Sequence, residues 1–233
     1  MGTVAMLKAA GIGLGDEVIV PAYGNVEIAE AVVSAGGLPV FADIDPGTYC
    51  LDAAAVTAAI GPRTAAIVAV RRFGESAGLQ QVHEVGTGKG LLVLQEVDTA
   101  DPSGAAEGDG PVAVGRRRAQ AAYLSARLRG VDAPVHSAGH TYRQYVVRVP
   151  GNGRPDRDAF ARAVRARGVR CSVPVKTPVH RLPEYRRDVE LPRTERAADE
   201  TLALQIGAEL GRRELQRIVS SCNALGGLLV PAF

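Results

Sequence analysis

The sequence lacks several features that would assign a protein to a class at once. It has no tryptophan, 3 cysteines among 233 residues and few aromatic residues. Its apolar runs are a handful of residues long, which excludes a membrane-spanning helix. The cysteines are far apart and odd in number, so they form neither a disulfide framework nor a zinc cluster. No charged region followed by a sustained apolar stretch opens the chain, and we therefore expect no secretion signal and a cytoplasmic location.

The sequence also has little net charge and few lysines. The formal net charge is +2, which provides no broad positive surface for nucleic acid. Only Lys8, Lys89 and Lys176 are lysines among the 27 basic residues. His136 and His140 are four residues apart, as in a helical zinc pair, but the Ser-Ala-Gly between them favours a loop. We expect no nucleic-acid, membrane or metal partner.

What is present in the first 95 residues is an alternation of apolar strands and short helices. The predicted strands are residues 17–20, 38–41, 66–70 and 91–94, and the predicted helices between them are 26–35, 52–60 and 77–84. Strands that are apolar throughout and alternate with helices indicate a parallel sheet covered on both faces.

The second half of the chain has a different pattern. Residues 99–114 are rich in turn formers and predict a loop or junction. Beyond them we expect helices over 115–130 and 156–167, strands over 145–149 and 169–173, and two closing helices, one with Ala198, Leu202 and Ile206 on one face and one over 215–225. The strand at 145–149 alternates and so has one solvated face, which favours a small α+β domain. We therefore predict two domains, residues 1–130 and 131–233.

Some short motifs allow both a functional and a structural interpretation. The glycine runs Gly11–Gly15 and Gly86–Gly90 lack the spacing of a phosphate-binding loop, and we interpret them as helix ends and turns. Glu96, Asp98 and Asp101 follow the fourth strand, where parallel sheets bind ligands. They form part of a site, a solvated loop or a helix N-cap.

Longer stretches carry a more specific signal. They are GTVA at residues 2–5, GIGLGDEVIVPAY at 11–23, AGGLPVFADIDP at 35–46, PRTAAI at 62–67, HTYRQYVVRVP at 140–150, PVHRLPEY at 178–185 and LPRTERA at 191–197. In this order they closely resemble the DegT/DnrJ/StrS family of sugar aminotransferases, which use pyridoxal 5'-phosphate (PLP) and have fold type I. The resemblance implies an α/β fold, a truncated fold-type-I large domain followed by a small C-terminal α+β domain.

The resemblance also implies roles for five positions around PLP. Gly2 and Thr3 match the Gly-Thr that binds the cofactor phosphate at a helix N-terminus. Asn25 stands where the family has an aromatic residue stacked on the pyridine ring, and asparagine cannot stack. Glu96 takes the place of the carboxylate that binds the pyridine nitrogen, and Thr99 that of the residue contacting the ring hydroxyl.

The largest departure from the family concerns the lysine that forms the Schiff base with PLP. The family carries this lysine in a long segment after the pyridine-binding carboxylate, whereas here Glu96 is followed by a turn-rich loop and the helix before the small domain. We expect Lys8 and Lys89 to be solvated and Lys176 to belong to the second domain. We therefore assign no catalytic residue and expect impaired or lost transaminase activity, because the covalent step and its base are removed together.

Other functions stay open beside amino transfer from an amino acid to a keto-sugar nucleotide. The chain could be a non-catalytic partner of a full-length relative, because lost central strands leave sheet edges uncovered and favour a homo-oligomer or a hetero-oligomer with that relative. It could run PLP-independent chemistry with Glu96, Asp98 and His180 as acid and base, His180 facing the substrate. A decayed gene product that folds poorly is the remaining alternative.

Overall fold

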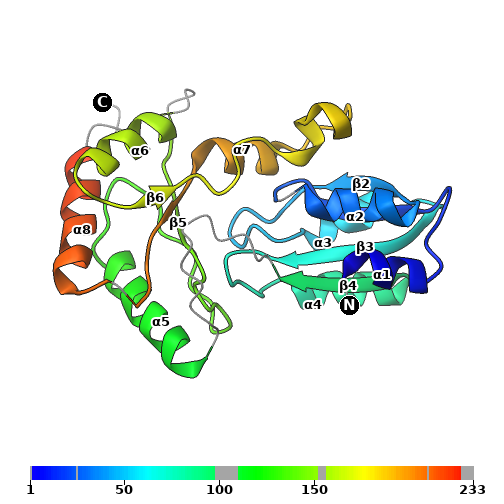
Figure 1. Cartoon of the computed structure of the whole chain (residues 1–233), viewed down its shortest axis with the longest axis horizontal. Coiled ribbons are helices and arrows are strands. Elements are labelled where there is room, and N and C mark those ends of the chain that lie inside the picture. Colours follow the sequence, from blue (N-terminus) through cyan, green and yellow to red (C-terminus); the bar gives the residue numbers. More distant parts are fainter. Residues whose placement is uncertain (1, 25, 98–109, 152–155, 209, 227–233) are drawn as a thin grey trace. The chain divides into compact units, whose positions relative to one another are not determined.

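The computed structural model describes residues 2–24, 26–97, 110–151, 156–208 and 210–226 (Figure 1). Contacts divide the chain into two compact units. Unit 1 comprises Met1–Arg72, Ser76–Asp98 and Thr177–Arg196, and unit 2 comprises Phe73–Glu75, Thr99–Lys176 and Ala197–Phe233. The domain boundary predicted between residues 130 and 131 is a different division of the chain, and it falls inside unit 2.

Unit 1 is built on a parallel sheet of four strands in the order β2-β1-β3-β4. The strands are β1 (Glu17–Pro21), β2 (Leu38–Ala42), β3 (Thr64–Arg71) and β4 (Leu92–Val97). All three pairings are parallel, and Val70 of β3 lies beside Glu96 of β4. The predicted parallel sheet and its four strands are confirmed.

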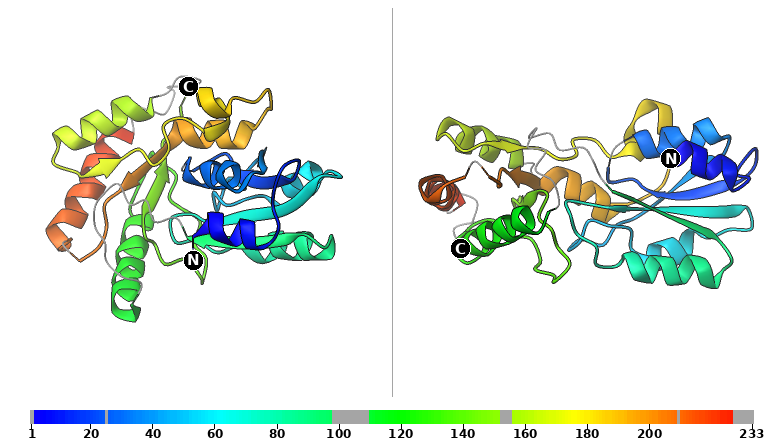
Figure 2. Two further views of the ribbon diagram at one scale, coloured as in Figure 1. Left: turned by 45° about the vertical axis from the view of Figure 1, so that its right-hand side comes forward. Right: turned by 60° about the horizontal axis from the view of Figure 1, so that its bottom comes forward.

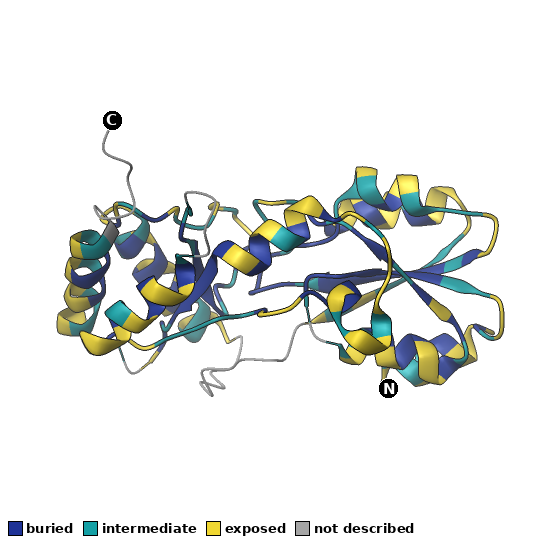
Figure 3. Ribbon diagram, turned by 90° about the horizontal axis from the view of Figure 1, so that it is seen from above, coloured by how far each residue is buried: buried dark blue, intermediate teal, exposed yellow. Residues whose placement is uncertain are grey.

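Helices cover both faces of this sheet, as predicted (Figure 2). They are α1 (Thr3–Ala9) and α2 (Glu27–Ala35) on one face, and α3 (Ala53–Ala59) and α4 (Leu79–Gly88) on the other. Val18 and Val20 of β1 pack in the core under α1 and α2, and Ile19 packs in the core under α3 and α4. Successive strand side chains thus enter opposite cores. Buried residues concentrate in the strands, and exposed ones on the outer helix faces (Figure 3).

Local capping sets the helix ends. The Asp52 side chain accepts hydrogen bonds from the backbone N–H groups of Ala54 at 2.7 Å and Ala55 at 3.3 Å, so it caps α3 as predicted. Gly36 ends α2 with φ of 99°, a conformation that favours glycine. The run Gly11–Gly15 forms the turn between α1 and β1, and the run Gly86–Gly90 spans the end of α4 and the following turn. Both runs are helix ends and turns, as interpreted.

Unit 2 contains an antiparallel sheet of three strands in the order β5-β7-β6. Its strands are β5 (Tyr145–Arg148), β6 (Cys171–Ser172) and β7 (Thr201–Leu204), and its main helices are α5 (Pro111–Ser125), α6 (Arg157–Ala166) and α8 (Arg212–Gly226). One core joins these helices to the sheet, including Leu124, Phe160 and Ile218. The mixed α and β composition of this half was correctly predicted.

The predicted helix through Ala198, Leu202 and Ile206 is wrong. Helix α7 (Pro192–Glu200) ends at Glu200, and the chain continues directly as β7, the central strand of the sheet. All four residues of β7 are buried; three of them are apolar, and the Thr201 hydroxyl donates a hydrogen bond to the Ala197 carbonyl at 2.7 Å. The fourfold spacing does not mark one helix face, because Ala198 lies near the end of α7, Leu202 belongs to the apolar part of β7 and Ile206 follows that strand. The predicted loop over 99–114 is also too long, because α5 begins at Pro111; residues 98–109 lie outside the described chain.

Within the ranges that the structure describes, no helix is long and apolar enough to cross a lipid bilayer. The same ranges hold no group of three or more His, Cys, Asp or Glu side chains placed to bind a metal ion.

Candidate functional site

The candidate site lies at the carboxyl ends of the strands in unit 1, where open parallel sheets bind ligands. Glu96 is the penultimate residue of β4, the strand at one edge of the sheet. Helix α1 begins at Thr3 and packs on the face toward which Leu92 and Leu94 of β4 also point. Because side chains alternate along a strand, Glu96 projects to that same face.

Thr3 and Glu96 are in direct contact. The Thr3 hydroxyl Oγ1 donates a hydrogen bond to Glu96 Oε1 over 2.5 Å, and both residues are half-buried. The family resemblance assigned Thr3 to the phosphate and Glu96 to the pyridine nitrogen, which are separate parts of one cofactor. The structure instead joins these two side chains to each other.

This contact tests whether the residues fit PLP, and they do not in this arrangement. The resemblance assigns the two side chains to separate ends of the cofactor, whereas their oxygens lie 2.5 Å apart and are bonded to each other, so they cannot contact those two ends as they stand. Charge repulsion also opposes cofactor binding, because a phosphate at Thr3 would lie next to the Glu96 carboxylate. Two like unit charges about 4 Å apart repel by about 4 kcal/mol at an effective dielectric constant of about 20. We therefore derive no step through this cofactor.

The other predicted cofactor residues add little to the site. Gly2 precedes α1 as its N-cap with extended backbone, and it is exposed. Asn25 and Thr99 lie outside the described residues, as do Asp98 and Asp101 of the acidic cluster. The predicted roles of these residues stay predictions.

His180 lies in a closed environment at the end of β1. It belongs to the short 3-10 helix η1 (Val179–Arg181), which the backbone N–H of Val179 fixes by donating to the carbonyl of Ala22 at 2.9 Å. Its side chain is 0% exposed, its Nε2 lies 3.2 Å from Glu195 Oε1, and its ring faces Phe41. Contact with a substrate would require this segment to open. With Asp98 outside the described chain, acid–base chemistry by Glu96, Asp98 and His180 gains no support from the geometry.

Glu195 holds His180 and its neighbour together. Arg181 donates to Glu195 Oε1 from Nη2 at 2.5 Å and from Nε at 3.2 Å. These hydrogen bonds from Arg181, with a further one from His180, hold the pKa of the Glu195 carboxyl below its usual range although burial opposes the shift. His180, Arg181 and Glu195 thus stabilise the packing of this segment, because the Glu195 carboxylate already accepts hydrogen bonds from the other two side chains.

All three lysines are exposed. Lys8 lies in α1, Lys89 follows α4 as its C-cap, and Lys176 belongs to unit 2. Lys89 precedes the first residue of β4, and Glu96 lies four residues further along the strand. At about 3.3 Å per residue, Leu92 and Glu96 are about 13 Å apart along β4, and Lys89 precedes the Leu92 end of the strand. The prediction that Lys8 and Lys89 are surface residues is confirmed.

Two polar clusters in the structure were not predicted from the sequence. The Asp43 carboxylate, just after β2, accepts hydrogen bonds from the backbone N–H groups of Arg193 and Thr194 and from the Thr194 hydroxyl, the last at 2.7 Å. It thereby satisfies free N–H groups at the start of α7. The sequence offers no local signal for this contact, because Asp43 and Thr194 are 151 residues apart.

The second cluster lies in unit 2 around a buried histidine. His140 is 4% exposed, and its Nδ1 accepts the backbone N–H of Tyr142 at 2.9 Å. Burial lowers the pKa of His140 from 6.5 to about 4, with Glu75 opposing and His136 and Arg118 reinforcing the shift. The segment is a loop, as predicted from its Ser-Ala-Gly, but its burial could not be foreseen from a loop composition.

Comparison with known proteins places the chain in a family. The model of the DegT/DnrJ/EryC1/StrS aminotransferase family matches residues 2–115 and 111–223. The L-glutamine:2-deoxy-scyllo-inosose aminotransferase of Streptomyces kanamyceticus is 47% identical over 90 residues, which are 39% of this chain and 21% of that protein. The GDP-perosamine synthase of Caulobacter vibrioides is 43% identical over 107 residues, 45% of this chain and 28% of that protein.

Solved structures share the fold over nearly the whole chain. The aminotransferase TlmJ of Streptoalloteichus hindustanus aligns with a TM-score of 0.86 at 24% identity, covering 98% of this chain and 84% of that one. NtdA of Bacillus subtilis, with bound cofactor PMP, aligns with a TM-score of 0.82 at 18% identity, covering 97% and 71%. The sequence matches above span only about a quarter of the curated relatives' length. The chain belongs to the DegT/DnrJ/EryC1/StrS aminotransferase family.

Proposed function

We propose that this chain is a shortened member of the family that does not catalyse transamination. In this proposal unit 1 is the truncated fold-type-I large domain. The observation that carries the proposal is the hydrogen bond between Thr3 and Glu96, which closes the predicted cofactor site on itself. Thr3 and Glu96 are held by each other, and no lysine is buried beside them.

The physical reason lies in what transamination requires of an amine. The amine must form a covalent bond with the cofactor and then move a proton between two carbons, so its position decides the rate. Correct placement is worth about 7–11 kcal/mol of the barrier. All three lysines are exposed, and this proposal therefore assigns that role to none of them.

The test measures adduct formation and turnover on the purified full chain. PLP is added, the absorbance spectrum is recorded, the sample is reduced with borohydride, and any modified lysine is identified by mass spectrometry. Turnover is then assayed with L-glutamine, the donor named for several relatives, and a keto-sugar nucleotide, the acceptor class that the resemblance implies. We expect neither a specific adduct nor turnover.

Single Lys8→Arg, Lys89→Arg and Lys176→Arg variants provide the matched control. Nonspecific modification of exposed amines falls slightly in each variant, whereas a true Schiff-base lysine accounts for the whole signal in one. An adduct confined to one lysine, together with turnover that its arginine variant abolishes, would overturn the proposal.

A second candidate function is that of a non-catalytic partner for another polypeptide, and the edge strand β4 favours it. Among the described strands β4 pairs only with β3. It contains no proline or lysine, and Val97 at its end is 41% exposed. Such an edge is available for pairing with a strand of a full-length relative or of a second copy.

Size measurements test this function. The chain is expressed alone and with a full-length relative, and the masses of the complexes are measured by light scattering. We expect a complex that Val97→Lys weakens, because a lysine at an edge opposes strand pairing. Val33→Lys is the control, since Val33 is an equally apolar residue, 51% exposed, on α2. A strictly monomeric chain in both preparations would refute the partner function.

A further inference from the structure

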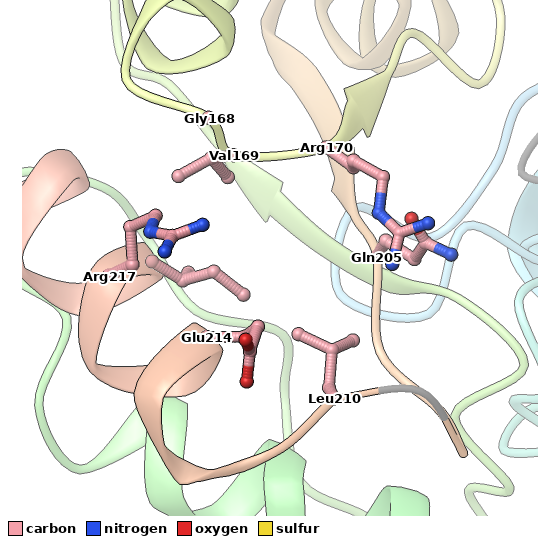
Figure 4. A pocket seen from close by; sticks show the side chains of 8 residues that line it. Gly168, Val169, Arg170, Gln205, Leu210, Glu214 and Arg217 are labelled. Carbon is pink, nitrogen blue, oxygen red and sulfur yellow. The ribbon is translucent and has the colours of Figure 1, made fainter.

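A pocket in unit 2 uses none of the residues of the candidate site (Figure 4). It has a volume of about 320 Å³ and lies between the end of α6, the start of β6 and the first turns of α8. Val169 and Ile218 in its lining are buried in the core of the unit, and Leu210 packs against the same core. The complete lining is Gly168, Val169, Arg170, Gln205, Leu210, Glu214, Arg217 and Ile218.

Unit 2 carries most of the positive charge of the chain. It contains 17 of the 27 lysines and arginines but only 11 of the 25 aspartates and glutamates, so its formal net charge is +6 and that of unit 1 is −4. The net charge of the whole chain, +2, conceals this division. An anionic partner is therefore attracted to unit 2 more than to unit 1.

Four exposed arginines lie on or beside the lining of the pocket. They are Arg167 at the end of α6 and Arg212, Arg213 and Arg217 in the first turns of α8. The two helices meet here, because a Cβ added at Gly168, the residue after Arg167, would lie 3.6 Å from Arg217 Nη1. Among the described residues, none of the four guanidinium groups has a hydrogen-bond or ion-pair partner. We call these four residues the arginine cluster.

The other charged side chains nearby have roles within the fold. Arg170 already interacts with another residue of the chain and is not part of the arginine cluster. Glu214 Oε2 would lie 3.0 Å from a Cβ added at Gly211, at the start of its own helix, where the helix dipole stabilises a carboxylate. Asp158, the acidic residue of α6, pairs with Arg157 at 2.7 Å. The arginine cluster thus keeps its positive charge toward solvent.

We propose that the arginine cluster and the pocket bind an acidic segment of a partner protein that carries an apolar anchor residue. Carboxylates of the segment pair with the arginine cluster, because planar guanidinium groups bind carboxylates through two parallel hydrogen bonds. An aliphatic side chain between these carboxylates enters the pocket against Val169, Leu210 and Ile218. A nucleic acid fits this surface less well, because the described lining has no aromatic side chain on which a base could stack.

Four fluorescein-labelled probes test the proposal on the full chain, with binding measured by fluorescence anisotropy. The first is a peptide of glutamates around one central leucine, and the second has glutamine in place of that leucine. The third has lysine in place of every glutamate, and the fourth is an oligothymidylate with the charge of the first peptide. We expect saturable binding of the first probe, at least about threefold weaker binding of the second and no binding of the third.

Salt should weaken the binding of the leucine peptide at least about fivefold between about 50 mM and about 200 mM, because exposed ion pairs are screened. Four results would each overturn the proposal. They are no saturable binding of the leucine peptide, equal binding of the leucine and glutamine peptides, binding of the lysine peptide as tight as that of the leucine peptide, and tighter binding of the oligothymidylate.

Substitutions separate the arginine cluster from general surface charge. Arg213→Gln combined with Arg217→Gln should weaken binding of the leucine peptide at least about fivefold, because an exposed ion pair contributes up to about fivefold. Arg186→Gln combined with Arg187→Gln is the matched control, since these arginines are equally exposed but belong to unit 1. Equal loss in the two double variants would show a nonspecific charge effect and refute the surface.

A substitution in the pocket tests the anchor separately. Leu210 is half-buried in the lining, and Leu210→Gln should remove the preference for the leucine peptide over the glutamine peptide. The double variant of Arg213 and Arg217 should keep this preference while both peptides bind more weakly. An undiminished preference in Leu210→Gln would refute the pocket as the place of the anchor.

Discussion

Two glycines at the end of α4 provide a sharp test of how this helix packs on the parallel sheet. A Cβ at Gly86 would lie 2.3 Å from Val93 Cγ2 and 2.9 Å from Ile67 Cδ1, so the helix and the sheet meet there without room for a methyl group. A Cβ at Gly88 would have nothing within 4 Å. Gly86→Ala and Gly88→Ala are therefore the same chemical change, two residues apart, in opposite environments.

The two substitutions should change the free energy of unfolding in opposite directions. Alanine is favoured over glycine in a helix by up to about 1 kcal/mol, and Gly88→Ala should gain about half of that at the last helical position. Gly86→Ala gains the same propensity but forces its methyl group into two branched side chains, and overpacking of this kind costs about 1–3 kcal/mol. With two contacts shorter than 3 Å, we expect the upper end of that cost and a net destabilisation of about 2 kcal/mol.

Urea unfolding followed by circular dichroism measures both effects against the unmodified chain. A Val93→Ala substitution added to Gly86→Ala removes the closest atom. The double variant should therefore lose about 1 kcal/mol less unfolding free energy than the two single variants lose in sum. If Gly86→Ala proves as stable as Gly88→Ala, or if Val93→Ala brings no recovery, the close packing of α4 on the sheet is refuted.

Two further predictions concern Asp43 and His140. Asp43→Ala removes three hydrogen bonds at the start of α7 and leaves the buried Thr194 hydroxyl without its acceptor, so urea unfolding should show a loss of about 2–3 kcal/mol. Asp188→Ala, at an exposed aspartate, should change stability by less than about 0.5 kcal/mol, and an equal loss in both variants would contradict the cap. Because the unfolded chain protonates His140 near pH 6.5 and the folded chain only near pH 4, stability should fall by about 3 kcal/mol as the pH is lowered through that window. His140→Asn keeps an acceptor for the Tyr142 N–H but cannot titrate. If the unfolding free energy of this variant depends on pH as that of the unmodified chain does, His140 does not cause the loss of stability at low pH.

The elements of unit 1 could be predicted because their sequence signals are local. Each strand of the parallel sheet is a short apolar run, and glycine or a capping residue such as Asp52 marks the adjoining helix ends. The segment after α7 shows where this reasoning fails. A strand buried on both faces and a buried helix present similar apolar runs, and only the pairing of β7 with β5 and β6 decides between them.

The residues of the candidate site could be located from motifs, but their contacts could not. Thr3 and Glu96 are 93 residues apart, and nothing in either motif indicates that their side chains bond to each other. His180 was likewise recognisable as part of a motif, while its complete burial follows from the packing of η1 against the end of β1. Long-range contacts of this kind depend on the whole fold and not on the spacing of residues.

The contact between Thr3 and Glu96 and the exposure of all three lysines both oppose the binding of PLP. A half-buried carboxylate loses hydration and needs a compensating partner. The resemblance implies that the pyridine nitrogen of PLP is this partner in the family, whereas here the Thr3 hydroxyl provides it. A hydrogen bond to a charged acceptor contributes about 1.5–3 kcal/mol, and a cofactor would have to displace it without gaining a covalent bond in return. Binding without a lysine would therefore be opposed twice, since the covalent anchor is missing and the carboxylate is already satisfied within the chain.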